Sequence, residues 1–252
     1  MQDKLSYKKL IAGDIPPWVR RYIKQTGKTI NSFDMIKENE TILLSVSGGK
    51  DSLALALALS LRRKWLPINY KLKAIMINWI EHPISDEAKQ LLYNFFLDLD
   101  IEFTIFDEPQ YSPSFKGEFN CYLCSRNRRR ILFNYAKENN LKIIALGHHL
   151  DDLVETTIIN LCFRGKFSTM LPVQEFFDSS LFLIRPMIEV HENVLKRLAN
   201  LYDLPVVKPV CPYDATNIRS KLKPIISNLS HIDHLTREHV FKAHEFAAKI
   251  TR

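Results

Sequence analysis

The residues best suited to chemistry in this chain lie in two short turns and one pair of cysteines. The first turn, Ser47-Gly-Gly-Lys-Asp-Ser52, follows an apolar run at 42–46 and precedes a Leu- and Ala-rich run at 53–61. This order predicts a buried strand, a two-glycine turn and the start of a helix. Glycines let the backbone approach a phosphate closely, and the free amides of a helix N-terminus point at its charge. A nucleotide is therefore the expected ligand.

Two common nucleotide-binding patterns are excluded at this turn. A P-loop requires Gly-Lys followed by Ser or Thr, with another glycine five positions earlier. Here Lys50 is followed by Asp51, and Leu44 stands where the first glycine would be. A dinucleotide-binding turn would need a third glycine in the G-x-G-x-x-G spacing. The remaining alternative is an ordinary strand-to-helix turn in which Asp51 and Ser52 cap the helix.

The second turn, Gly147-His-His-Leu-Asp-Asp152, follows another apolar run at 142–146. Ligands of parallel sheets bind beyond the carboxyl ends of the strands, so both turns should line one crevice. Carboxylates in a first helical turn are often only partners of the helix dipole. A bound triphosphate, however, brings Mg²⁺, which usually takes one or two protein carboxylates. We expect Asp51 and Asp152 to hold Mg²⁺, with Asp151 as a second choice.

The two histidines of the second turn have different expected roles. One of His148 and His149 should support a phosphate or the substrate, and the other should be a packed, hydrogen-bonded histidine. Lys50 in the first turn either adds positive charge to the site or points to solvent.

The four cysteines fall into a pair and two single residues. Cys121-Tyr-Leu-Cys124 opens a predicted helix, so its two thiols share one face. Zinc, an iron–sulfur cluster and a thiol–disulfide pair all remain open, although a zinc ribbon would need a second such pair. Cys211 is the obvious third ligand, and three ligands leave one coordination position free. Cys162 lies in an amphipathic helical pattern and is expected in the core, as free cysteines usually are.

The elements that must position these residues alternate between strands and helices. Strands are predicted at 42–46, 73–80, 102–106, 142–146 and 181–184. Helices are predicted at 18–24, 31–37, 52–65, 86–99, 121–139, 153–163, 193–202, 221–229 and 236–250. The alternation predicts a three-layer α/β fold with a mostly parallel sheet and helices on both faces. We divide the chain into an N-terminal helical segment (1–38), a nucleotide-binding domain (39–215) and a C-terminal helical segment (216–252).

Composition and charge narrow the class of protein. The 252 residues are 46% hydrophobic and 25% charged, which is ordinary for a soluble globular protein. Because no apolar run approaches the length of a membrane span and no signal-peptide core is present, we expect a cytoplasmic protein without a membrane partner. The net charge of +7 favours polyanionic partners. The expected RNA contacts are Arg126, Arg128, Arg129 and Arg130. A second basic group comprises Lys208, Arg219, Lys221 and Lys223.

Four motifs in this order resemble the TtcA family of tRNA 2-thiocytidine synthetases over residues 18–230. The motifs are Ser47–Ser52, Cys121-x-x-Cys124-Ser-Arg126, Leu146-Gly-His-His-x-Asp-Asp152 and Arg185-Pro186. The resemblance implies the PP-loop version of the adenine nucleotide α-hydrolase fold. It implies ATP, Mg²⁺ and a [4Fe–4S] cluster on Cys121, Cys124 and Cys211. The chain departs from the best-known bacterial members around Cys211, where they carry a second C-x-x-C, so the exact RNA target does not follow.

The activity implied by this resemblance replaces the 2-oxo group of an anticodon-loop cytidine with sulfur. The carbonyl oxygen would attack the α-phosphate of ATP, pyrophosphate would leave, and a sulfur nucleophile would then displace AMP. The sulfur would be held by the cluster, or as a persulfide on Cys124 or Cys211. Expected ATP-binding residues are Ser47, Gly48, Gly49, Asp51, Ser52, Ile77, Asn78 and Gly147, with the adenine near Ile77 and Asn78. Expected catalytic residues are Lys50, Asp51, Cys124, Asp152 and Cys211.

The partners implied by the resemblance are tRNA, a sulfur donor and a second copy of the chain. The donor would be a cysteine desulfurase or inorganic sulfide. An alternative reading is a PP-loop ligase or thiolase that acts on a small molecule, for which AMP release would not depend on RNA. A third reading is a non-catalytic nucleotide-sensing or zinc-binding module, which the carboxylate pair at the second turn disfavours.

Overall fold

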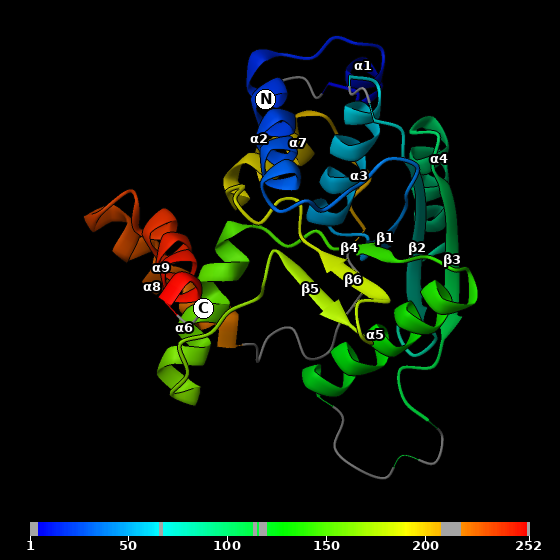
Figure 1. Ribbon diagram of the computed structural model, residues 1–252. Coiled ribbons are helices and arrows are strands. Elements are labelled where there is room, and N and C mark those ends of the chain that lie inside the picture. The colour runs from blue at the N-terminus through cyan, green and yellow to red at the C-terminus, as the bar shows by residue number, and fades with distance from the viewer. Residues whose placement is uncertain (1–4, 66–67, 113–114, 116–119, 208–217, 251–252) are drawn as a thin grey trace.

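The computed structural model describes residues 5–65, 68–112, 115, 120–207 and 218–250. Within them, six strands form one sheet in the order β3-β2-β1-β4-β6-β5 (Figure 1). The parallel strands are β1 (Thr41–Val46), β2 (Lys71–Trp79), β3 (Glu102–Glu108), β4 (Ile143–Ala145) and β6 (Leu181–Ile184). The edge strand β5 (Val173–Phe176) is antiparallel to β6 and was not predicted from the sequence. The predicted mostly parallel sheet is confirmed.

Alternation along the strands assigns each side chain to one of the two faces of the sheet. Ile42 and Leu44 of β1 belong to the larger core cluster, whereas Leu43 belongs to a smaller one. The larger cluster packs against α2 (Pro17–Ser32), α3 (Lys50–Arg63), α4 (Asp86–Asp98) and α7 (Glu192–Leu201), near the short α1 (Lys8–Ile11). The smaller cluster packs against α5 (Cys121–Glu138), which covers the other face (Figure 1). Helices therefore lie on both faces, as predicted.

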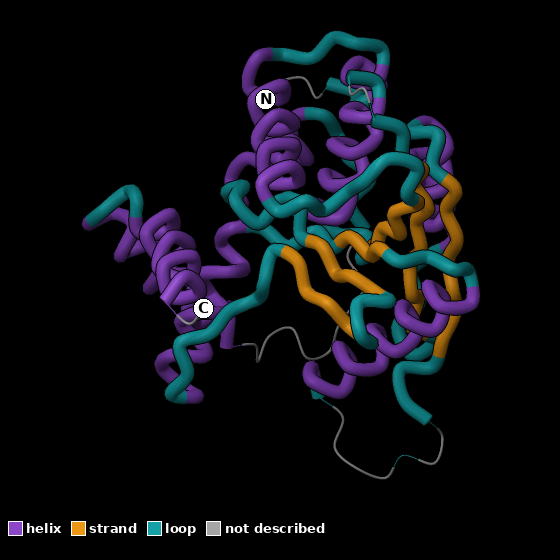
Figure 2. The backbone as a smooth tube through the Cα atoms, in the orientation of Figure 1, coloured by secondary structure: helices purple, strands orange, loops and turns teal. Residues whose placement is uncertain are grey.

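A third apolar cluster lies beside the sheet. It joins α6 (Leu150–Arg164), α8 (Ile218–Ile232) and α9 (Thr236–Ile250), which form a separate group of helices in Figure 2. Leu153 and Val154 of α6 pack there with Leu222 and Phe241. The second half of α6 extends past this cluster, and Phe163 is 58% exposed. The expectation that Cys162 lies in the core is therefore wrong, because its side chain is exposed on this overhanging part of the helix.

Helix boundaries follow local signals in most places. Ser85 caps α4, where its hydroxyl oxygen accepts the Ala88 amide at 3.3 Å. The predicted helices at 18–24 and 31–37 are replaced by one long α2 that ends at Ser32. The second of them is wrong because Asp34 adopts the left-handed conformation, with φ of 47°. Along the described helices, none combines the length and the apolar character needed to cross a bilayer.

Candidate active site

The two special turns are in contact because they follow neighbouring strands. β1 pairs with β4, and each strand leads directly into its turn. A Cβ atom on Gly147 would lie 2.9 Å from the carbonyl carbon of Asp51 and 3.0 Å from the Ser52 nitrogen. Real side chains do not approach a backbone this closely, so only glycine allows the second turn to pack on the start of α3. The structure thus gives Gly147 a packing role beside the phosphate loop.

The two serines of the phosphate loop, residues 47–52, form hydrogen bonds within it. The Ser52 hydroxyl donates to the Gly49 carbonyl at 2.9 Å, and the Gly49 amide donates to the Ser47 hydroxyl at 3.3 Å. Gly48 has φ of +77°, which favours glycine. Its carbonyl accepts the Val207 amide at 2.9 Å, so Val207, four residues before Cys211, is hydrogen-bonded to this loop. Cys211 itself lies outside the described residues.

The two predicted magnesium ligands flank one imidazole. Asp51 Oδ1 lies 3.7 Å and Asp152 Oδ2 lies 3.5 Å from Nε2 of His149. Asp51 Oδ1 is buried and has no hydrogen-bond partner. A buried carboxylate oxygen without a donor is costly, and a cation would satisfy it. The carboxylates therefore fit Mg²⁺ shared with phosphate oxygens. Among the described residues, no three or more His, Cys, Asp and Glu side chains form a complete metal site.

Asp151 has a different environment from its neighbour. Its Oδ2 accepts the backbone amide of Glu192 at 2.7 Å, and its Oδ1 accepts Nε of Arg237 at 2.6 Å. Both oxygens are therefore used to hold the start of α7 and the start of α9 against α6. The structure assigns Asp151 to the scaffold.

The two histidines have different hydrogen-bond partners. His149 is 3% exposed and caps α6, where its Nδ1 accepts the Asp152 amide at 3.4 Å while Asp152 accepts the His149 amide at 3.1 Å. It is the packed histidine. His148 accepts a hydrogen bond on Nδ1 from Nε of the buried Arg185 at 3.2 Å. Burial lowers the pKa of His148 to about 4, so the ring is neutral at pH 7.

Lys50 points into the site and does not extend into solvent. Its ammonium lies 3.0 Å from Glu192 Oε1 and 3.1 Å from Asp51 Oδ2. Burial opposes its charge, but the carboxylates outweigh this and raise the pKa of Lys50. Burial would likewise raise the pKa of Glu192, yet hydrogen bonds from Lys196 and Lys50 hold it at about 2. Glu192 is a site residue that the sequence did not reveal, since an acid in a first helical turn is common.

Helix α8 contributes two further cations that sequence reasoning left without a role. Arg219 Nη1 lies 3.8 Å from Asp152 Oδ1, and Lys223 Nζ lies 3.3 Å from Glu192 Oε1. Lys223 also lies 3.9 Å from the buried Glu155, and burial raises the pKa of Glu155 to about 7 although Lys223 opposes this. The i, i+4 spacing of the two cations was the available signal.

The cysteine pair lies at the start of α5. Asn120 caps the helix by accepting the Leu123 amide at 3.1 Å. Cys121 is exposed, Cys124 is half-buried, and neither forms a disulfide. Cys124 accepts a hydrogen bond from the side chain of Gln110 at 3.3 Å. Two free thiols on one helical turn are suitable soft donors for an iron–sulfur cluster, which would take Cys211 as its third protein ligand.

The arginines of α5 fall into two kinds. Arg126, Arg129 and Arg130 are exposed. Arg128 is half-buried, and its guanidinium carbon lies 5.6 Å from the ring centroid of Trp79. This cation–π contact gives Arg128 a packing role that the exposed arginines lack.

The predicted adenine site lies at the end of β2. β1 pairs with β2 only as far as Met76, so Ile77 and Asn78 continue past the end of β1 beside the phosphate loop. Both residues are buried, and the Asn78 side chain donates to Asp107 and accepts the Ile84 amide at 3.0 Å. A nucleotide would therefore meet backbone here, which remains a prediction.

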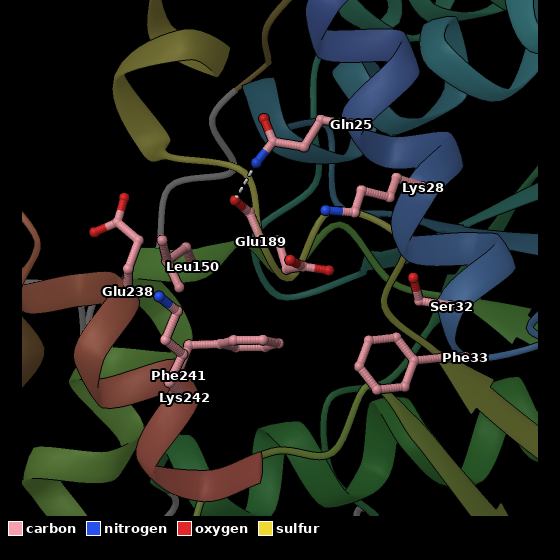
Figure 3. Close-up of a pocket in the computed structure, with 9 residues that line it drawn as sticks. All are labelled: Gln25, Lys28, Ser32, Phe33, Leu150, Glu189, Glu238, Phe241 and Lys242. Carbon is pink, nitrogen blue, oxygen red and sulfur yellow. Dashed lines mark hydrogen bonds between the residues drawn. The ribbon is translucent and has the colours of Figure 1, made fainter. Parts of the chain in front are cut away.

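A separate cavity of about 320 Å³ lies between α2 and α9. Figure 3 shows Phe33 and Phe241 on opposite sides of it, with Lys28 reaching in from α2. Its lining contains none of the predicted site residues. The cavity touches the second turn only through Leu150.

Comparison with known proteins agrees with these features. The family model ATP_bind_3, described as a PP-loop domain, matches residues 19–224. A tRNA-cytidine(32) 2-sulfurtransferase of Francisella tularensis subsp. tularensis (strain WY96-3418) is 33% identical over 192 residues, which cover 75% of this chain and 71% of the relative. The corresponding protein of Paraburkholderia xenovorans (strain LB400) is 32% identical over 217 residues, 82% of this chain and 62% of that relative.

Among solved structures, the U34-tRNA thiolase NcsA from Methanococcus maripaludis with its [4Fe-4S] cluster is similar with a TM-score of 0.73 and 25% identity. The match covers 92% of this chain and 79% of that one. The chain therefore belongs to the PP-loop family, within the TtcA group of tRNA-cytidine 2-sulfurtransferases.

Proposed function

We propose that this chain is an ATP-dependent tRNA sulfurtransferase that forms 2-thiocytidine through an adenylated base. The observation that carries the proposal is the placement of the Asp51 and Asp152 carboxylates around His149, where the phosphate loop meets the second turn. Relatives named as tRNA-cytidine(32) 2-sulfurtransferases support cytidine 32 as the target.

The first step activates the base. The 2-oxo oxygen attacks the α-phosphorus of ATP while the bond to the β-phosphate breaks, and pyrophosphate leaves. Negative charge grows on the leaving group, so fixed cations beside it lower the barrier. Lys50 is such a cation, and Arg219 and Lys223 add charge from α8. Mg²⁺ held by Asp51 and Asp152 would supply further neutralisation of the phosphate oxygens.

The second step delivers sulfur to the activated carbon, with AMP as the leaving group. Cys121 and Cys124 would hold the cluster together with Cys211, and a bound cluster would supply an iron position open to sulfide. The Val207 amide bonds to the Gly48 carbonyl at 2.9 Å, only four residues before Cys211. Because four extended residues span at most about 14 Å, covalent geometry limits how far Cys211 can lie from Val207. We propose on this ground that both steps share one crevice.

The remaining assignments follow from this chemistry. Arg126, Arg129 and Arg130 present exposed positive charge beside the cysteines and would contact tRNA phosphates. A cysteine desulfurase or inorganic sulfide would supply the sulfur. We further propose that the enzyme acts in the cytoplasm and as a homodimer.

The proposal is tested with protein reconstituted anaerobically with iron and sulfide. Incubation with ATP, Mg²⁺, sulfide and tRNA should release AMP and pyrophosphate in proportion to 2-thiocytidine, measured by mass spectrometry of tRNA nucleosides. Omission of tRNA should suppress AMP release. AMP release that is independent of RNA, without thiolated nucleoside, would instead identify a thiolase or ligase for a small molecule.

A further inference from the structure

A buried glutamine lies against the sulfur of Cys124. Gln110 follows β3 by two residues, yet it is only 2% exposed. Its side-chain Nε2 lies 3.3 Å from Cys124 Sγ, and its Oε1 lies 3.1 Å from His82 Nε2. We propose that Gln110 is a positioning residue for Cys124. The side-chain amide N–H of Gln110 donates to the Cys124 sulfur, which would bind the cluster. The inference rests on the proposed function, because it concerns the ligand chemistry of that sulfur.

The chemistry of the partners determines which way the amide faces. A thiolate only accepts hydrogen bonds, so the NH₂ end of the amide must point to Cys124 when this sulfur is ionised. The oxygen end then faces His82, whose Nε2 must carry the proton. Reversal of the amide would place its oxygen against the sulfur and remove the donor from it. With its Nε2 protonated, His82 donates to the amide oxygen and supports the orientation in which the amide donates to the sulfur.

The backbone of Gln110 is anchored as firmly as its side chain. Its amide donates to both carboxylate oxygens of Glu81, at 3.0 and 2.9 Å. Its carbonyl accepts Nδ2 of Asn127 at 2.7 Å. Asn127 lies three residues after Cys124 on α5, so the helix that carries the sulfur also holds the backbone of its donor. Gln110, the turn after β2 and the start of α5 thus form one connected unit.

This arrangement has an electronic consequence for a bound cluster. Hydrogen bonds to ligand sulfurs influence the reduction potential of iron–sulfur clusters. The reduced cluster carries one more negative charge, and an N–H donor stabilises that state more than the oxidised one. Gln110 should therefore raise the potential of the cluster. A glutamine that merely filled space would leave the potential unchanged.

The test measures the midpoint potential of the reconstituted cluster in the full chain by a spectroscopically monitored redox titration. Gln110→Leu removes the donor at similar volume, and Gln110→Glu replaces it with a carboxylate. Both should shift the potential downward, and Gln110→Glu should do so at least as far. His82→Ala removes the partner of the Gln110 amide oxygen, so the amide is no longer held in one orientation. This variant should give a smaller downward shift of the potential. The matched control is Gln25→Leu, which removes a glutamine that donates to the Glu189 carbonyl, and it should leave the potential unchanged.

The possible outcomes separate this inference from the proposed function. Intact clusters with wild-type potentials in both Gln110→Leu and Gln110→Glu would overturn it. If circular dichroism shows that Gln110→Leu is unfolded, the nearly isosteric Gln110→Glu decides the question. A wild-type protein that assembles no cluster and thiolates no tRNA would refute both the proposed function and this inference.

Discussion

Lys50 and Glu192 form a 3.0 Å ion pair that joins the phosphate loop to the first turn of α7. The same carboxylate oxygen lies 3.3 Å from Lys223 of α8. One acid thus links three elements at the edge of the site. Its strongly lowered pKa makes this connection measurable through the dependence of stability on pH.

The first prediction concerns Glu192 and acid. Its folded pKa of about 2 lies below its ordinary value of 4.5, so its charge stabilises the fold fully above pH 4.5, and this contribution disappears as the pH falls toward 2. Glu192→Gln should reduce the free energy of unfolding at pH 7 by about 1–2 kcal/mol, a value already reduced for solvent screening. Urea unfolding at pH 7 and pH 3.5 should show the two proteins converging at the lower pH. A constant difference would contradict this.

The second prediction concerns Asp51, whose Oδ1 is buried without a donor. Asp51→Asn should slow pyrophosphate release by at least about a hundredfold, since it removes a charge that acts on the reacting phosphates. It should cost little stability, because Asp51 Oδ1 has no donor to lose and Lys50, the partner of Oδ2, keeps its ion pair with Glu192. The added thermal stability that MgATP gives to the wild type should also disappear. Normal adenylation would refute the role of Asp51.

Asp151→Asn is the matched control for Asp51→Asn. Asp151 accepts hydrogen bonds from the Glu192 amide and from Arg237, and both would be weakened. We expect this variant to lose about 1–3 kcal/mol of stability, because a charged hydrogen-bond partner is removed from a buried site. Chemical denaturation of both variants measures the contrast. Equal stability losses in the two would show that the structural distinction between these aspartates is wrong.

The third prediction concerns the contact between the turns. A Cβ atom at position 147 would press on the backbone of Asp51 and Ser52 at 2.9–3.0 Å. Gly147→Ala should therefore displace the phosphate loop and lower kcat/KM for ATP by about a hundredfold. Gly165→Ala is the control, because Gly165 has φ of +62° but open space around it. That variant should lose about 1 kcal/mol of stability and keep its ATP kinetics. Unchanged kinetics in Gly147→Ala would argue against the packing role.

The fourth prediction concerns the arginines of α5. Arg129→Ala and Arg130→Ala should each weaken tRNA binding and reduce the slope of log K against log salt by about 1. Arg128→Ala should instead lower stability by about 0.5–1 kcal/mol, because it loses the contact with Trp79. Filter binding at several salt concentrations measures the slopes. Lys64→Ala is the control, since Lys64 follows α3 at the end away from the phosphate loop, and its slope should equal that of the wild type.

Parts of the site could be predicted from sequence because their signals are local. The phosphate loop is recognisable since strand, glycines and helix start are adjacent in the chain. The cap of α4 is likewise local, because Ser85 acts on an amide three residues away. Asp152 was preferred to Asp151 as a magnesium ligand from the sequence, but the contacts of Asp151 with Glu192 and Arg237 were not predicted. Which of the two aspartates faces Asp51 depends on the rotation of α6 against α7 and α9.

Other features depend on contacts between segments far apart in the chain. Glu192 reaches Lys50 across 142 positions, and Lys223 reaches Glu192 from a helix that follows Cys211 in the sequence. Gln110 gives no motif, and its meaning comes only from the sulfur beside it. Cys162 has the pattern of a core residue but is exposed, because none of the elements that the structure describes covers the end of α6.

The order of residues alone was thus sufficient for the nucleotide loop, the alternating strands and helices, and the family. Folding in three dimensions added the ionic links around Lys50, the sorting of Asp151 from Asp152 and the environment of Cys124. The physical reason is the separation along the chain of the residues that interact. Backbone conformation and capping are set by neighbours within one or two turns of chain, whereas ion pairing and burial depend on which distant elements the sheet order brings together.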